Sequence, residues 1–231
     1  MHNQNGWSTS HHPSLPTSRS ARGQQRSVIA VLRSLVPIRL LSTDEAERLA
    51  ERQADRLLHL AGISEPQVPT ELIAELPRIT VRLDPQLPVS GSAQWVSGRW
   101  LISLNAGEPW TRRRFSLMHE FKHVLDHPRV DDLYAGEAQA EHLADYFAAS
   151  VLMPRRFVER LWEDGMRDLA ALAFHFGVSQ PAMAIRLQYL GLRQAPERHD
   201  PYHRPTTGRS DSSASSPYHR LSHPLQGALA S

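Results

Sequence analysis

The chain contains no cysteine among its 231 residues. This absence excludes disulfide bonds, thiolate zinc ligands and a cysteine nucleophile. Any zinc ion would therefore have to be held by nitrogen and oxygen ligands. Histidine, with 13 residues, is the ligand type in surplus, so a histidine and carboxylate site is the metal chemistry that remains open.

The chain also has little net charge and only one lysine, Lys122. A formal net charge of +2 gives no strong indication of a nucleic-acid or membrane partner. The most hydrophobic early run, 27–41, is interrupted by Arg33, Pro37 and Arg39 and is too short to cross a bilayer. No small-residue cleavage site follows it, so we predict a cytoplasmic protein without a membrane partner.

Both ends of the chain have almost nothing to bury. Residues 1–27 and 193–231 are rich in Ser, His, Arg and Pro, so we predict that both are disordered tails. Their histidines are expected to be solvated, with at most weak affinity for metals. The folded part is therefore predicted to be 28–192.

The middle of the chain predicts an α+β fold that is mostly helical. Apolar residues recur at helical spacing in 41–63, after a cap at Ser42 or Thr43. The pattern changes to alternation in 78–105, which predicts a small antiparallel β-sheet with a hairpin across Ser97 and Gly98. The remainder is predicted to be helical, with helices over 111–126 and 137–152 and two more within 168–192.

The predicted helix 111–126 carries the motif His119-Glu120-x-x-His123. Residues four apart lie on one face of a helix, so both imidazoles can reach a single ion. Glu120 projects about 100° away from His119, where it can address a bound water without occupying a ligand position. Zinc lowers the pKa of such a water, and the glutamate removes its proton as the water attacks a carbonyl.

A catalytic zinc site uses three protein ligands, so a third must come from elsewhere in the chain. His127 is rotated about 80° off the ligand face, and no glycine turn separates it from His123, so we set it aside. Glu141 lies in the predicted helix 137–152, which is rich in alanine. Small side chains let two helices approach closely, which gives Glu141 the reach to act as the third ligand.

Other residues of the same helix leave alternatives open. Glu137 and His142 are rivals of Glu141 for the third position. Asp145 follows Glu141 by one turn and is placed to accept a hydrogen bond from a ligating imidazole, which would fix its tautomer.

Two segments, "RFSLMHEFKHVLDHP" and "EHLADYFAASVLMP", resemble the active-site helix and the third-ligand helix of the ImmA/IrrE-type metallo-endopeptidases. The segment "LAFHFGVSQPAMAIRLQYLGL" is similar to the helices that usually follow, and the resemblance covers about residues 40–192. It implies one zinc ion held by His119, His123 and Glu141, with Glu120 as catalytic base. It also implies a gluzincin-like fold, in which the edge of a small sheet could hold an extended peptide.

The resemblance extends to partners and to domain organisation. Better-known members cleave, or relieve repression by, helix-turn-helix repressors in mobile-element induction and stress responses, so the implied substrate is a DNA-binding repressor. We expect a zincin-like metallopeptidase domain over 28–155 and a helix-turn-helix-like segment over 156–192. Lys122 stands where the family often has a glycine, and we expect it to be exposed.

Residues 168–192 also fit a helix-turn-helix framework, which raises the question of DNA contact. A recognition helix presents polar side chains to bases and phosphates, and the second helix here offers only Gln180, Arg186 and Gln188 among apolar residues. A compact helical cap on the core is the simpler interpretation.

The sequence therefore predicts a zinc metallo-endopeptidase. The alternative is a non-catalytic, metal-bound regulator that docks to a repressor or to DNA. Glu120 favours the enzyme, because a closed structural zinc site does not need a base at that position.

Overall fold

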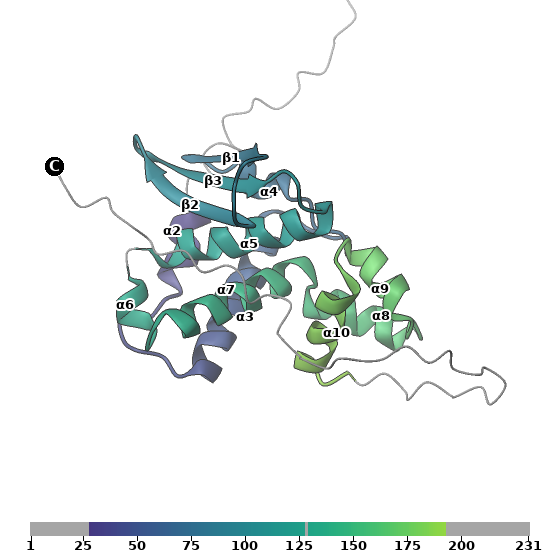
Figure 1. Ribbon diagram of the computed structural model, residues 1–231. Helices are drawn as coiled ribbons and strands as arrows, with labels where there is room; N and C mark the ends of the chain where they lie inside the picture. Colours follow the sequence, from purple (N-terminus) through teal and green to yellow (C-terminus); the bar gives the residue numbers. More distant parts are fainter. Residues whose placement is uncertain (1–27, 128, 193–231) are drawn as a thin grey trace, which may run out of the picture.

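The computed structural model describes residues 28–127 and 129–192, and the two predicted tails lie outside these described residues (Figure 1). The elements follow in the order α2 (Val28–Ser34), α3 (Thr43–Leu60), α4 (Glu71–Ala74), β1 (Ile79–Asp84), β2 (Gly91–Val96), β3 (Arg99–Asn105), α5 (Trp110–Asp126), α6 (Val130–Leu133), α7 (Glu137–Leu152), α8 (Arg155–Glu163), α9 (Leu169–Phe176) and α10 (Gln180–Tyr189). The predicted α+β class is confirmed. None of the described helices has the length and apolar character needed to cross a membrane.

The sheet has three strands in the order β1-β3-β2. The expected hairpin joins β2 to β3 in antiparallel fashion, and its turn residues Ser97 and Gly98 both have positive φ, 48° and 81°, as a two-residue hairpin turn requires. β1 differs from the expected antiparallel pairing, because it runs parallel to β3. β3 lies between the other two strands, parallel to β1 and antiparallel to β2. β2 is left at one edge of the sheet.

Helix α5 lies between the sheet and the other long helices (Figure 1). Most of its residues are buried, including polar ones such as Arg114, His119 and Glu120. Polar groups in such a position need hydrogen-bond or charged partners, because an unpaired buried polar group costs free energy. The surroundings of α5 therefore have to supply those partners.

Helix α7 packs against α5 and against α3. Its buried face includes three alanines at helical spacing, Ala140, Ala144 and Ala148. Small side chains at a contact favour short distances between helix axes. α3 begins with the predicted cap, since the Ser42 side chain accepts a hydrogen bond from the Glu45 amide and the Glu45 side chain reaches back to the Ser42 amide.

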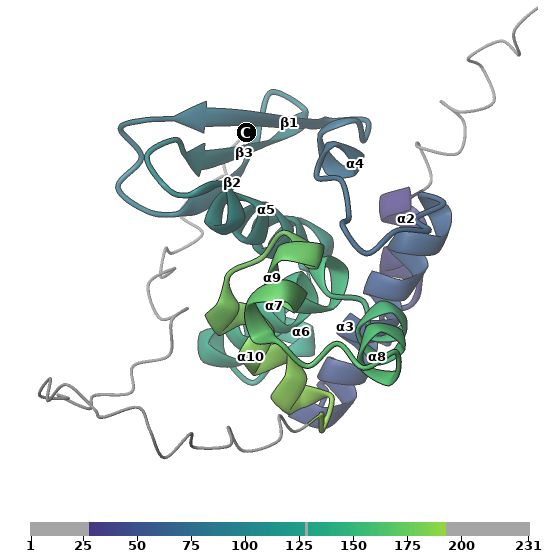
Figure 2. The same cartoon turned by 90° about the vertical axis from the view of Figure 1, so that its right-hand side faces the viewer.

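Helices α9 and α10 form the predicted pair with a turn between them. α9 ends at Gly177, whose φ of 61° is left-handed, and Ser179 caps α10 by accepting a hydrogen bond from the Ala182 amide. α10 packs against α9 and contacts α7 (Figure 2).

Arg186 of α10 is fully buried. Its guanidinium donates to Glu51 of α3 at 2.7 Å and to the carbonyl of Met153 at 3.0 Å. Burial acts to raise the pKa of Glu51, but the hydrogen bonds and charge of Arg186 outweigh burial and lower it. Arg186, one of three side chains that the sequence offered for DNA contact, thus faces the core.

Replacing Arg186 with alanine should lower the free energy of unfolding by about 3 kcal/mol, because it leaves the mostly buried Glu51 carboxylate without its main partner. Urea unfolding followed by circular dichroism measures this change. Arg155 also lies near Glu51, with its Nε atom 3.7 Å from Glu51 Oε1, but its side chain is 44% exposed. R155A should therefore lower the free energy of unfolding by less than about 1 kcal/mol. Equal losses in the two variants would contradict a special role for the buried pair.

Candidate metal centre

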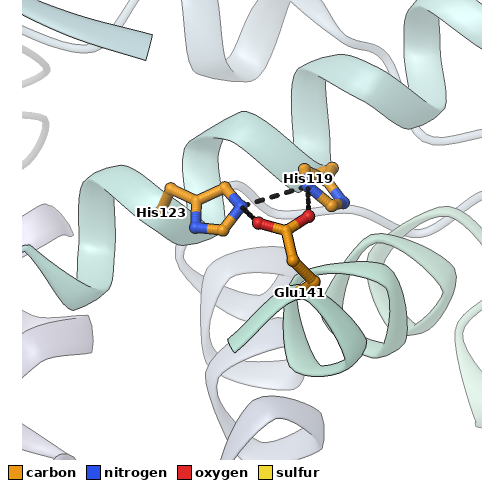
Figure 3. Close-up of side chains that lie close together, drawn as sticks. All are labelled: His119, His123 and Glu141. Carbon is orange, nitrogen blue, oxygen red and sulfur yellow. Dashed lines mark hydrogen bonds and ion pairs between the residues drawn. The ribbon is translucent and has the colours of Figure 1, made fainter. Parts of the chain in front are cut away.

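Helices α5 and α7 bring three predicted ligands together at their contact (Figure 3). The Nε2 atoms of His119 and His123 lie 3.1 Å apart. Glu141 places one carboxylate oxygen 3.3 Å from His119 Nε2 and the other 3.2 Å from His123 Nε2. His119 comes from the middle of α5, His123 follows one turn later, and Glu141 lies in the second turn of α7.

The spacing of these donor atoms fits a single zinc ion. Zinc bonds to nitrogen and oxygen are about 2.0–2.2 Å long, so ligand atoms of a tetrahedral site lie roughly 3.3 Å from one another. The two Nε2 atoms lie 3.1 Å apart, and each has a different oxygen of the Glu141 carboxylate at 3.2 or 3.3 Å, which is close to that value. With one donor atom taken from each residue, all three lie within 4.8 Å of one another. Two imidazoles and one carboxylate are also a donor set that zinc accepts and that leaves a fourth position open.

Asp145 lies behind His119. Its Oδ1 atom is 2.8 Å from His119 Nδ1, so a carboxylate there accepts a hydrogen bond from Nδ1–H. When His119 is neutral, this bond fixes the tautomer in which Nε2 carries a lone pair and faces the other two donors. Asp145 is therefore positioned to orient the His119 imidazole, and its role toward a metal stays a prediction.

The rivals of Glu141 lie elsewhere. His142 points to Glu47 of α3, with Nε2 and Oε1 2.7 Å apart. Glu137 is exposed at the start of α7. His127, at the end of α5, packs edge-on against Trp100 with ring centroids 5.0 Å apart. Among the described residues, the one group of three such side chains that could hold an ion is His119, His123 and Glu141.

The charged groups of the site shift one another's pKa. Burial acts to lower the pKa of His119, but hydrogen bonds to Asp145 and Glu141 outweigh it and raise this pKa to about 9. Burial acts to raise the pKa of Glu141, but the hydrogen bonds to His119 and His123 outweigh burial and lower this pKa to about 2. Both shifts favour a protonated His119 beside an ionised Glu141. Because a ligating imidazole must be neutral, a metal ion bound here would compete with that proton.

Glu120 is buried on the side of α5 that faces the sheet. A Cβ atom on Gly91, the first residue of β2, would lie 2.9 Å from both the Cγ and Oε1 atoms of Glu120. Glycine at this position therefore leaves the room that the Glu120 carboxylate occupies. Sequence reasoning did not single out Gly91, because its contact with Glu120 is non-local.

Residues 74–188 match the model of the Peptidase_M78 family, described as the IrrE N-terminal-like domain. The match supports the ImmA/IrrE family. The matched segment runs from the end of α4 to α10 and contains both helices of the metal centre. Among solved structures, a Mycobacterium tuberculosis transcriptional regulator is similar, with a TM-score of 0.48 and 18% sequence identity over 74% of this chain and 53% of that chain. The chain thus spans about half of that structure's length, and no curated protein matches it.

Lys122 is not exposed, so the expectation from sequence was wrong at this position. Its side chain is 1% exposed and its Nζ atom lies 2.6 and 2.7 Å from the two carboxylate oxygens of Asp126. Tyr134 completes the cluster, with its hydroxyl 3.0 Å from Lys122 Nζ and 2.7 Å from Asp126. Burial, together with the neighbouring Asp126 carboxylate, raises the pKa of Tyr134. The cluster ties the His123 end of α5 to the segment that leads into α7.

Replacing Asp145 with asparagine should weaken zinc binding by about 10- to 100-fold, because a partner of this kind orients and polarises the ligating imidazole. Titration of the metal-free protein with zinc against a chromogenic chelator measures the affinity. Glu137→Gln is a matched control, since it removes an exposed carboxylate from the same helix. Wild-type affinity in D145N would show that Asp145 does not support the metal.

Proposed function

We propose that this protein is a zinc-dependent endopeptidase. The observation that carries the proposal is the group of three donor residues close enough to share one ion. Glu120, the residue after His119 on the same helix, supplies a carboxylate that is not part of this group. The match to a peptidase family over the same segment supports it.

In this proposal His119, His123 and Glu141 hold the ion, and each side chain nearby has a distinct task. A zinc ion held there would supply Lewis-acid chemistry: it would polarise the peptide carbonyl and lower the pKa of a bound water. Glu120 accepts the proton of the attacking water and then delivers it to the leaving amine. Asp145 keeps His119 in the tautomer that presents Nε2 to the ion.

The sheet supports a peptide as the substrate. β2 is an edge strand, and among the described residues its ladder hydrogen bonds go to β3. An extended peptide can add to such an edge through main-chain hydrogen bonds. Because Gly91 begins β2 and lies against Glu120, a peptide added to this edge would pass close to the proposed base.

The nature of the substrate rests on the family. Following the ImmA/IrrE resemblance, we propose that the substrate is a helix-turn-helix repressor and that cleavage takes place in the cytoplasm. The buried position of Arg186 supports a role for α9 and α10 in the protease itself rather than on DNA.

The test compares wild type with H123A, E141A and E120Q in the full-length chain. We expect one more zinc ion per chain in wild type and E120Q than in H123A and E141A, since any metal on the tails is common to all four. Mass spectrometry of a randomised peptide library should show cleavage by the zinc-loaded wild type and at least about 100-fold slower cleavage by E120Q. If wild type binds zinc but cleaves no peptide, the non-catalytic regulator is favoured. If the four proteins contain the same amount of zinc, the proposed metal site is wrong.

Replacing Gly91 with alanine should slow cleavage by about 10- to 100-fold without loss of zinc, because the new Cβ displaces the Glu120 carboxylate and small misplacements of a catalytic group are costly. Kinetics on one cleaved library peptide measure the effect. Ser92→Ala, at the next position of β2, is the control and should leave the rate within about twofold. Full activity of G91A would mean that Glu120 does not need its present position.

A further inference from the structure

A hollow opens between the start of α5 and the start of α10. Its volume is about 260 Å³. Most of its lining is apolar and comes from Pro109, Phe115, Val178, Pro181 and Ala182, and the side chain of Arg112 lies at its edge. A cavity of about 150 Å³ lined by apolar side chains can take up benzene, so this hollow is large enough for a large apolar side chain.

The hollow lies one helical turn from the metal centre. Phe115 precedes His119 by four residues, which puts the two on the same face of α5 and about 6 Å apart along the helix axis. An extended peptide advances about 3.3 Å per residue. A substrate side chain that enters the hollow would therefore belong to a residue within about two positions of the peptide bond that lies at the metal centre.

The same end of β2 borders both places. Arg112, at the edge of the hollow, donates to the Ser90 hydroxyl at 3.3 and 3.4 Å. The next residue, Gly91, lies against Glu120. The edge strand on which we propose that the peptide lies thus starts between the hollow and the base.

Helix α10 forms the opposite boundary of this region. At its start, the turn from α9 is fixed on α5, since a Cβ on Gly177 would lie 2.8 Å from the ring of Trp110. At its end, Tyr189 packs against Tyr146, with ring centroids 5.1 Å apart, and its ring centroid lies 6.4 Å from that of His142. Tyr146 and His142 both belong to α7, so α10 runs from the hollow to the helix that carries Glu141.

We propose that this hollow is the pocket that selects the substrate, and that it receives a large apolar side chain next to the bond to be cut. The inference rests on the proposed function, because it names a subsite of that activity. It assigns α10, which the sequence predicted as part of a helical cap on the core, to the recognition of the peptide.

The test narrows the hollow from two sides. Thr111→Phe adds a ring from the half-buried first turn of α5, and Ala182→Leu adds bulk from α10; both positions line the hollow. Thr43→Phe makes the same change in the first turn of α3, where Thr43 is exposed, and is the matched control. Cleavage sites in a randomised peptide library are read by mass spectrometry for the zinc-loaded full-length proteins. Binding of the same peptides is measured on the E120Q background, which leaves them uncut.

Wild type and T43F should prefer Phe, Leu or Met over Ala at one position beside the cut. T111F and A182L should reduce that preference at least about tenfold in kcat/KM, while they retain zinc and cleave peptides with a small residue there. The absence of an apolar preference in wild type, or a preference that survives in both filled variants, would overturn the proposal. If peptides bind E120Q with the same apolar preference but wild type does not cut them, the hollow is a peptide-binding pocket and the proposed peptidase activity is wrong.

Discussion

The close contact between α5 and α7 is the constraint on which the site depends. An ion can be shared between two helices only if their side chains meet within a few tenths of an ångström of the right spacing, and a glutamate has limited reach. Ala140, Ala144 and Ala148 give α7 a buried face of small side chains, and α3 and the sheet hold the pair from either side (Figure 1). The hydrophobic core thus fixes a distance as well as excluding water.

Helix α5 serves different purposes on different faces. His119 and His123 meet Glu141, while Glu120 faces β2, and Lys122 with Asp126 faces Tyr134. Each of these polar groups would be costly to bury alone. Their partners come from three separate stretches of the chain, so the stability of α5 and the geometry of the site arise from the same contacts.

The parts of this arrangement that follow from local periodicity could be predicted from sequence. The spacing of His119 and His123 places both on one helix face whatever surrounds them, and alanine-rich spacing pointed to α7 as the partner helix. The burial of Lys122 could not be predicted, because it depends on Tyr134 folding back over α5. The parallel pairing of β1, the inward turn of Arg186 and the contact of Gly91 with Glu120 are likewise non-local, and the hollow beside Phe115 exists only once α10 has docked.

The burial of Lys122 has a chemical consequence. It is the only lysine of the chain, and its ammonium group is held by Asp126 and Tyr134 with 1% of the side chain exposed. The folded molecule therefore offers no lysine amine to acylating reagents, and one becomes available when the end of α5 separates from Tyr134. The rate at which Lys122 is acylated would therefore report how often the end of the helix that carries His123 opens.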